Sequence, residues 1–220
     1  MKLSEKYRPK EFTEVLGQDK AINTIQGIIA REGWAGQCWY LTGATGTGKT
    51  TLARIIANTG APACQIVEIN ANRVNLDFVR EIENRIESAS MFGGRAWIIN
   101  EAHLLQNRVV SAFLDCLETI AEKEHDIIIF TTTSAGSDSL FEDCFDSKPF
   151  AGRCNQISLT NQGFNQCIIN RLQEIASLEN IPLDEKQAKA IVKATGATMR
   201  EAIQELIKIE RVEQNLAIVA

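Results

Sequence analysis

The segment at residues 43–50 constrains this chain more than any other part of its sequence. It reads GATGTGKT, matches the pattern G-x-x-x-x-G-K-T, and lies between the apolar run 38–41 and a helical pattern that begins near Lys49. Glycines permit positive φ angles, so the backbone N–H groups of such a loop can turn inward around a phosphate, and the following helix adds the positive end of its dipole. The pattern predicts a polyphosphate-binding loop in which Lys49 reaches the β- and γ-phosphates and the Thr50 hydroxyl ligates Mg²⁺. The alternative is a glycine-rich turn without a ligand, which would not require Lys and Thr at these positions.

The composition bounds the class of protein. With 220 residues, 45% hydrophobic and 23% charged, the chain is expected to form one ordinary domain and a smaller one. No apolar run approaches the roughly 18 residues of a membrane helix, so no membrane partner is expected, and residues 1–9 contain no apolar signal region. The six cysteines form no C-x-x-C pair, which favours reduced thiols and a cytoplasmic protein. The net charge of −5 indicates that any DNA contact is a local patch.

Strand and helix patterns alternate over the first 160 residues. Five short apolar runs predict strands at residues 37–42, 66–70, 96–100, 127–133 and, more weakly, 154–159. Apolar positions at helical spacing predict helices at residues 18–31, 49–58, 75–90 and 107–121. Strands that alternate with helices predict an α/β fold with a parallel five-stranded sheet flanked by helices.

The strand signal stops after residue 160. Three amphipathic patterns follow at about residues 161–178, 184–194 and 198–212, punctuated by Pro182 and Gly196. We therefore expect a nucleotide-binding α/β domain over residues 1–160 and a small three-helix domain over residues 161–220.

Two polar residues end the third predicted strand. Asn100 and Glu101 follow the apolar residues 96–99, where a phosphate-loop ATPase normally carries an Asp-Glu pair. Glu101 can polarise the attacking water, whereas Asn100 offers a carbonyl oxygen to the metal shell without a negative charge, so Mg²⁺ should be held more weakly. A plain strand terminus is the alternative interpretation.

Three further polar residues are candidate site residues, and each also has a simpler explanation. Thr133, at the end of the fourth strand, is positioned to lie between the γ-phosphate and the water, but threonine is also a good strand residue. Arg153 precedes the fifth strand and Arg200 opens the last helix, and either one alone reads as an ordinary solvated charge.

Together these residues resemble the AAA+ ATPases, and within them the small ATPase subunits of sliding-clamp loaders, of the bacterial γ/τ type and the replication factor C type. The opening EKYRPKEFTEVLGQ at residues 5–18 is similar to the family's E-K-Y-R-P…F…V-G-Q. Residues 100–103 resemble its D-E-x-H box, residues 152–154 its S-R-C motif and residues 199–202 its sensor-2 segment, while Thr133 falls on its sensor-1 residue. The resemblance covers nearly all of residues 1–215.

The resemblance implies a role for each matching residue. Arg153 would reach the γ-phosphate held by a neighbouring subunit, and Arg200 that of its own chain. The implied catalytic residues are Lys49, Glu101, Thr133 and Arg153, and the implied Mg²⁺ site is Thr50 with Asn100. The implied contacts to ATP are Tyr7, Arg8, Pro9, Val15 and Leu16 beside the adenine, with Gly46, Thr47, Gly48, Lys49, Thr50, Thr51 and Arg200 at the phosphates.

The implied function is an ATP-hydrolysing module that loads a sliding clamp onto primed DNA. Its implied partners are other clamp-loader subunits in a ring, the clamp, and primed or double-stranded DNA, with Arg80 and Arg108 as candidate DNA contacts. Two alternatives stay open: a nucleotide-binding structural subunit with little hydrolysis, and another DNA-acting AAA+ motor such as a branch-migration helicase or a replication initiator.

The chain departs from the family pattern in several places. Asn100 replaces Asp, Gly152 replaces Ser, and the stretch 134–151 is long and acidic. No four-cysteine zinc module follows the phosphate loop, and the C-terminal collar domain is expected to be absent from this chain.

Overall fold

A computed structural model of the chain describes residues 2–88, 90, 92–123, 125–133, 147–160, 163–196 and 198–219. Most of the acidic stretch of the sequence, with Asp138, Glu142, Asp143 and Asp146, lies outside these residues, as does Cys144. The chain divides into two compact units. The sheet unit comprises Gln18–Ala44 and Gly48–Leu159, and the helical unit comprises Met1–Gly17, Thr45–Thr47 and Thr160–Ala220. Each unit is described by itself.

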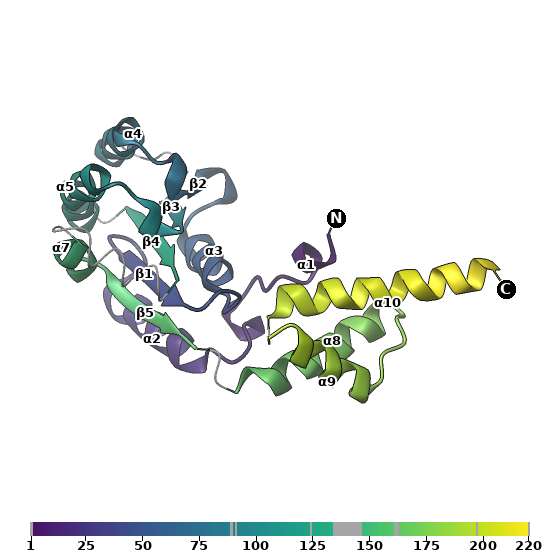
Figure 1. Ribbon diagram of the computed structural model, residues 1–220. Helices are drawn as coiled ribbons and strands as arrows, with labels where there is room; N and C mark the ends of the chain where they lie inside the picture. Colours follow the sequence, from purple (N-terminus) through teal and green to yellow (C-terminus); the bar gives the residue numbers. More distant parts are fainter. Residues whose placement is uncertain are drawn as a thin grey trace. The chain divides into compact units, whose positions relative to one another are not determined.

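The sheet unit is built on a parallel five-stranded sheet, as the sequence predicts (Figure 1). The strands are β1 (Cys38–Gly43), β2 (Ile66–Asn70), β3 (Arg95–Asn100), β4 (Asp126–Thr132) and β5 (Asn155–Leu159). Their order is β2-β3-β4-β1-β5, and every neighbouring pair is parallel. Each predicted run overlaps a strand. The central strands β1, β3 and β4 are buried on both faces and read as continuous apolar runs, whereas β2 and β5 are only partly buried.

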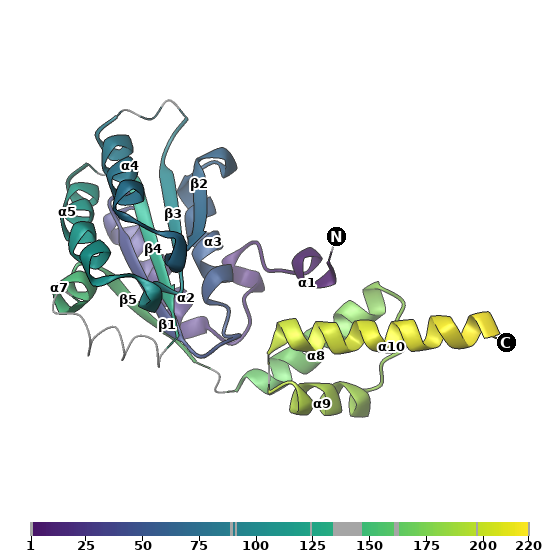
Figure 2. The ribbon, with the colours of Figure 1, turned by 45° about the horizontal axis from the view of Figure 1, so that its top comes forward.

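Helices cover the sheet. They are α2 (Asp19–Glu32), α3 (Lys49–Gly60), α4 (Leu76–Glu87), α5 (Asn107–Lys123) and α7 (Ser147–Gly152), and short 3-10 turns lie at Ala63–Gln65 (η2), Ala71–Arg73 (η3) and Ala102–Leu104 (η4). Figure 2 shows α4, α5 and α7 along one side of the sheet. Alternate strand residues, such as Cys38 and Tyr40 of β1, belong to the core beneath these helices.

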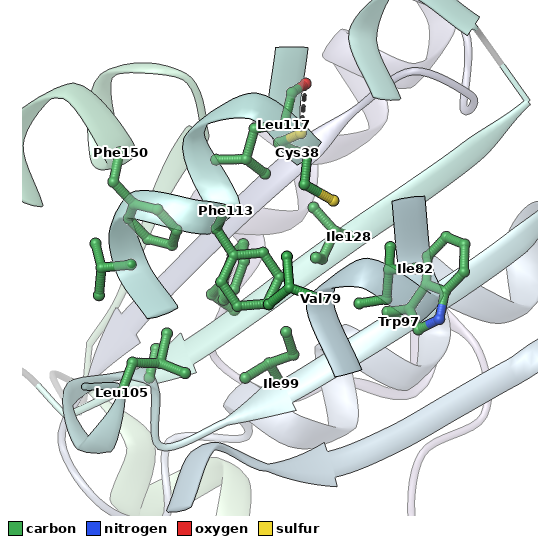
Figure 3. Close-up of a cluster of buried hydrophobic side chains, with 14 of the residues drawn as sticks. Cys38, Val79, Ile82, Trp97, Ile99, Leu105, Phe113, Leu117, Ile128 and Phe150 are labelled. Atoms are coloured by element: carbon green, nitrogen blue, oxygen red, sulfur yellow. Dashed lines mark hydrogen bonds between the residues drawn. The ribbon is translucent and has the colours of Figure 1, made fainter. Parts of the chain in front are cut away.

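An aromatic cluster anchors α7 in that core (Figure 3). The ring centroid of Phe150 lies 4.7 Å from that of Phe130 on β4. The ring centroid of Phe113 on α5 lies 5.3 Å from that of Phe130, and both pairs have edge-to-face geometry. Such pairs contribute about 0.5–1.5 kcal/mol beyond their buried area. Phe150 thereby fixes the segment that carries Arg153, because its carbonyl accepts a hydrogen bond from the Arg153 N–H.

The helical unit contains α8 (Phe164–Leu178), α9 (Glu185–Ala194) and α10 (Met199–Val219), together with the N-terminal α1 (Leu3–Lys6) and the 3-10 turn η1 (Phe12–Glu14). Its core is formed by the apolar faces of the three long helices, including Ile168, Leu172 and Leu206. Asp184 caps α9 reciprocally with Gln187, which fixes where that helix begins. None of the helices within the described residues is long and apolar enough to cross a membrane.

Candidate nucleotide and metal site

Three polar segments of the sheet unit lie at the carboxyl ends of its strands, and one of them consists of residues 43–44 and 48–50 of the phosphate loop. The phosphate loop begins at the last residue of β1, Glu101 follows β3, and Thr131 and Thr132 end β4, directly before Thr133. β4 lies between β1 and β3. Because all these strands are parallel, their carboxyl ends lie at the same edge, which is where open α/β sheets bind ligands. The strand order cannot be read from the sequence, but it brings these polar segments together.

The phosphate loop has the backbone conformation that its glycines permit. Gly46 and Gly48 have φ angles of 85° and 94°, in the left-handed region. Gly48 is the N-cap of α3, whose first residue is Lys49. Gly48 has no side chain with which to cap α3, and the N–H groups of the first turn and the positive end of the helix dipole are directed toward the space before the helix.

The ammonium group of Lys49 is directed back along this loop. Lys49 Nζ donates to the carbonyl oxygens of Gly43 at 2.8 Å and Ala44 at 2.9 Å. Burial of this side chain lowers its pKa, and the negative charge of Glu101 opposes that shift. Lys49 and Glu101 are therefore close enough to interact electrostatically, and their catalytic roles stay predictions.

Asn100 is at the centre of a hydrogen-bond network that joins four elements. Its Oδ1 accepts from the hydroxyls of Thr50 on α3, at 3.0 Å, and Thr131 on β4, at 2.9 Å. Its Nδ2 donates to Glu68 Oε1 on β2 at 3.0 Å. The two residues predicted to hold Mg²⁺, Thr50 and Asn100, are therefore in direct contact.

Glu101 is held in an unusual backbone conformation. Its φ and ψ are 58° and 48°, and it is one of two residues other than glycine with positive φ in the described part of the chain. Such a conformation costs about 1–3 kcal/mol and persists only where the surroundings impose it, frequently at functional sites. His103 lies beside it: His103 Nδ1 is 3.7 Å from Glu101 Oε2 and 2.9 Å from the Thr132 hydroxyl.

The two threonines that end β4 have different partners. Thr131 bonds to Asn100 and Thr132 to His103. Thr133 follows the end of the strand, and its predicted role as sensor stays a prediction. Thr51, next to Thr50, lies in the first turn of α3.

The predicted adenine-contacting residues belong to the N-terminal segment of the helical unit. Tyr7 donates its hydroxyl to Glu179, which also accepts from Lys6, and this hydrogen bond raises the pKa of Tyr7. Arg8 pairs with Glu5 at 2.7 Å, while Pro9, Val15 and Leu16 are half-buried. Arg200 is exposed in the first turn of α10.

Arg153 lies near the amino ends of the strands, whereas the phosphate loop follows the carboxyl end of β1. It precedes β5, whose first residue, Asn155, is level with Trp39, whereas Leu159 is level with Gly43. Four residues of strand correspond to about 13 Å. The guanidinium is bound to Glu118 of α5, with Arg153 Nε 3.0 Å from Glu118 Oε1, and to the Pro149 carbonyl at 3.1 Å.

The two candidate DNA contacts are exposed arginines. Arg80 of α4 pairs with Asp77 at 3.1 Å, and Arg108 in the first turn of α5 donates to Gln106 at 3.0 Å. Neither interaction distinguishes a DNA contact from an ordinary surface charge.

The residues at the sheet edge fit a magnesium nucleotide. Thr50 gives its hydroxyl proton to Asn100, so the lone pairs of its oxygen stay available to a cation. Lys49 and the first turn of α3 supply the positive charge that phosphates need.

Sequence reasoning missed Glu68 and Arg54. Arg54 of α3 binds Glu68 with two hydrogen bonds, Nε to Oε2 at 2.6 Å and an Nη to Oε1 at 3.1 Å. One signal was available: Glu68 is the only charged residue in the apolar strand Ile66–Asn70. It also missed Glu118 as the partner of Arg153, for which the sequence offers no signal.

Comparison with known proteins agrees with the fold. The model of the ATPase family associated with various cellular activities matches residues 39–152. The chain is 26% identical over 222 residues to DNA polymerase III subunit tau of Bacillus subtilis, covering 90% of this chain and 37% of that protein. It is 27% identical over 212 residues to the replication factor C small subunit of Thermoplasma acidophilum, covering 92% of this chain and 62% of that protein.

A solved structure with the same fold is the Holliday junction branch migration motor RuvB of Thermotoga maritima. It matches with a TM-score of 0.71 at 22% identity, covering 97% of this chain and 67% of that one. At this identity the likeness shows the fold alone.

The family match extends over more than half of the chain, which therefore belongs to the AAA family of ATPases. The resemblance to clamp-loader ATPases of the γ/τ and replication factor C types is confirmed by the relatives. The chain spans between about a third and three fifths of the length of the first curated relatives it matches, 37%, 33% and 59%.

Proposed function

We propose that this chain is the ATP-binding and ATP-hydrolysing module of a DNA clamp loader, which couples ATP to the loading of a sliding clamp on primed DNA in the cytoplasm. The observation that carries the ATP site is the Thr50–Asn100 hydrogen bond, at 3.0 Å, because it joins the phosphate loop to the end of β3, directly before Glu101. The observation that favours clamp loading over other ATP-driven work is the similarity to subunits of DNA polymerase III and replication factor C over 90% or more of this chain.

Each residue has a proposed task. Lys49 binds the β- and γ-phosphates, and Glu101 accepts the proton of the attacking water, with Thr133 orienting it. Tyr7, Arg8, Pro9, Val15 and Leu16 contact the adenine, and Arg200 contacts the γ-phosphate. Thr50 and Asn100 hold Mg²⁺, which neutralises phosphate charge when it is bound.

Arg153 is proposed to act on a nucleotide held by a neighbouring subunit. Its position supports this, because Arg153 precedes the amino end of β5 and the phosphate loop follows the carboxyl end of β1. The length of these paired strands separates Arg153 from its own phosphate loop. The proposal requires a ring of subunits, with the clamp and primed or double-stranded DNA as further partners. Arg80 and Arg108 are the proposed DNA contacts, and they would bind phosphates without reading sequence.

A structural subunit that holds nucleotide but scarcely hydrolyses it is the second candidate, favoured by the uncharged Asn100. Turnover of the complex with partner subunits, clamp and primed DNA separates the two. For the enzyme, Glu101→Gln should lower turnover by about 10²–10⁴-fold, while the exposed Glu81→Gln on α4 should not change it. Equal turnover in wild type and Glu101→Gln would support the structural subunit.

The other candidate is a different DNA-acting motor, such as a branch-migration helicase or a replication initiator. The shared fold with RuvB is compatible with this alternative. Stimulation of hydrolysis by a clamp together with primed DNA would favour the clamp loader. Stimulation by branched DNA with no effect of any clamp would favour the other motor.

A further inference from the structure

Asn100 occupies the position where the family carries an aspartate, and its side-chain amide has a defined direction. Its oxygen accepts from two hydroxyls, Thr50 and Thr131, and its nitrogen donates to Glu68. Hydroxyl groups can donate or accept, so the two threonines tolerate either orientation of the amide. An ionised carboxylate only accepts, so Glu68 alone discriminates between the two orientations.

Glu68 is itself fixed by Arg54. The guanidinium binds both carboxylate oxygens, at 2.6 Å and 3.1 Å. Glu68 Oε1 is shared between Arg54 and Asn100 Nδ2. Arg54 and Thr50 lie four residues apart on α3, on the same side of the helix, so one helix holds both ends of this network.

We propose that Glu68 is a positioning residue for the magnesium site: by accepting from Asn100 Nδ2, it holds Asn100 Oδ1 on Thr50 and keeps that threonine oxygen available to the cation. This inference rests on the proposed function of the site. Without Glu68 the amide can rotate, and its N–H groups then face the position of a cation, which they repel.

The same geometry explains why an amide suits position 100 in this chain. An aspartate there would place a carboxylate oxygen where Nδ2 now lies, 3.0 Å from Glu68 Oε1. Two carboxylates at that distance repel each other and cannot both be ionised without a cost. Asn100→Asp alone therefore should not strengthen Mg²⁺ binding. The charge of Glu68 must be removed as well.

The experiment measures the Mg²⁺ dependence of ATP binding by calorimetry, in magnesium and in EDTA. The variants are Glu68→Ala, Glu68→Gln, Asn100→Asp and Asn100→Asp with Glu68→Gln, and the control is Glu81→Ala, which breaks an exposed pair with Arg85 on α4. Tryptophan fluorescence of each variant before titration reports whether the sheet unit is folded.

Glu68→Ala should weaken binding in magnesium by about 10–100-fold, the usual effect of losing a partner that orients a metal ligand, and leave binding in EDTA unchanged. Glu68→Gln keeps an acceptor oxygen and should retain most of the affinity. Asn100→Asp alone should bind no tighter than wild type in magnesium, and the double variant should bind about tenfold tighter than Asn100→Asp.

Equal Mg²⁺ dependence of Glu68→Ala and wild type would overturn the inference, as would tighter binding by Asn100→Asp alone with no further change in the double variant. Failure of the proposed function has a different signature. In that case wild type itself would bind no ATP in either magnesium or EDTA.

Discussion

Arg153 and Glu118 form an ion pair on the surface of the sheet unit, with Arg153 Nε 3.0 Å from Glu118 Oε1. The two side chains are 36% and 56% exposed, so the pair contributes at most about 1 kcal/mol. An arginine supplied to a neighbouring nucleotide is worth about 10³–10⁵-fold in rate. The pair is therefore weak enough to break if Arg153 acts on a neighbouring subunit as proposed.

We expect Glu118→Gln to raise ATP turnover of the assembled complex by no more than about fivefold, because the free energy of the exposed pair is the most that can be recovered. Arg153→Ala should lower that turnover by about 10³-fold or more. Glu122→Gln, also exposed on α5, is the matched control and should have no effect. Unchanged turnover in the Arg153→Ala complex would remove Arg153 from the mechanism.

A second prediction concerns the buried pair between Arg95 and Asp126. Asp126 is 1% exposed and accepts from the Arg95 backbone N–H, Nε and an Nη group, at 3.0, 2.9 and 2.8 Å. Asp126→Ala leaves the buried guanidinium without its counter-charge and should lower the free energy of unfolding by about 3–5 kcal/mol.

Urea unfolding followed by tryptophan fluorescence measures this loss, since all three tryptophans, Trp34, Trp39 and Trp97, lie in the sheet unit. Glu81→Ala, which removes an exposed ion pair with Arg85, should change the same free energy by less than about 1 kcal/mol. Similar losses of unfolding free energy in both variants would show that the buried pair stabilises the fold no more than the exposed pair.

The described cysteines should differ sharply in reactivity. Burial raises the pKa of Cys38 to about 12 and also raises the pKa of Cys116 and Cys154, whereas Cys64 is exposed. The thiolate is the reactive form, so at about pH 8 only about one in ten thousand Cys38 thiols is reactive, and this fraction rises with pH. Alkylation read by peptide mass spectrometry should modify Cys64 first and the three buried thiols only after unfolding. Modification of Cys38 as fast as Cys64 in the native protein would contradict the packing of this core.

Much of the fold could be predicted from the sequence because the strands of a buried parallel sheet are continuous apolar runs. The weakest run, at residues 154–159, is β5, where only Ile157 and Leu159 of the strand are buried. The short α1 and η1 could not be predicted, since three or four residues carry no periodicity.

The site could be predicted in part. The phosphate loop and the Asn100–Glu101 pair are local patterns, and parallel strands bring their ends together. The Glu68–Asn100 contact depends on the register in which Asn70 lies opposite Asn100, and a single sequence does not contain that register. The same holds for Tyr7 and Glu179, which meet across 172 positions of the chain.

The central claim is that Lys49 and the loop around it bind a magnesium nucleotide. Calorimetric titration of ATP in millimolar Mg²⁺ into the purified chain tests it most directly, with Lys49→Ala as the paired variant. The account predicts saturable heat for wild type and binding weakened by about 100-fold or more in Lys49→Ala, because the Lys49 ammonium is then lost from the loop. No heat with wild type, or the same affinity in both proteins, would contradict it.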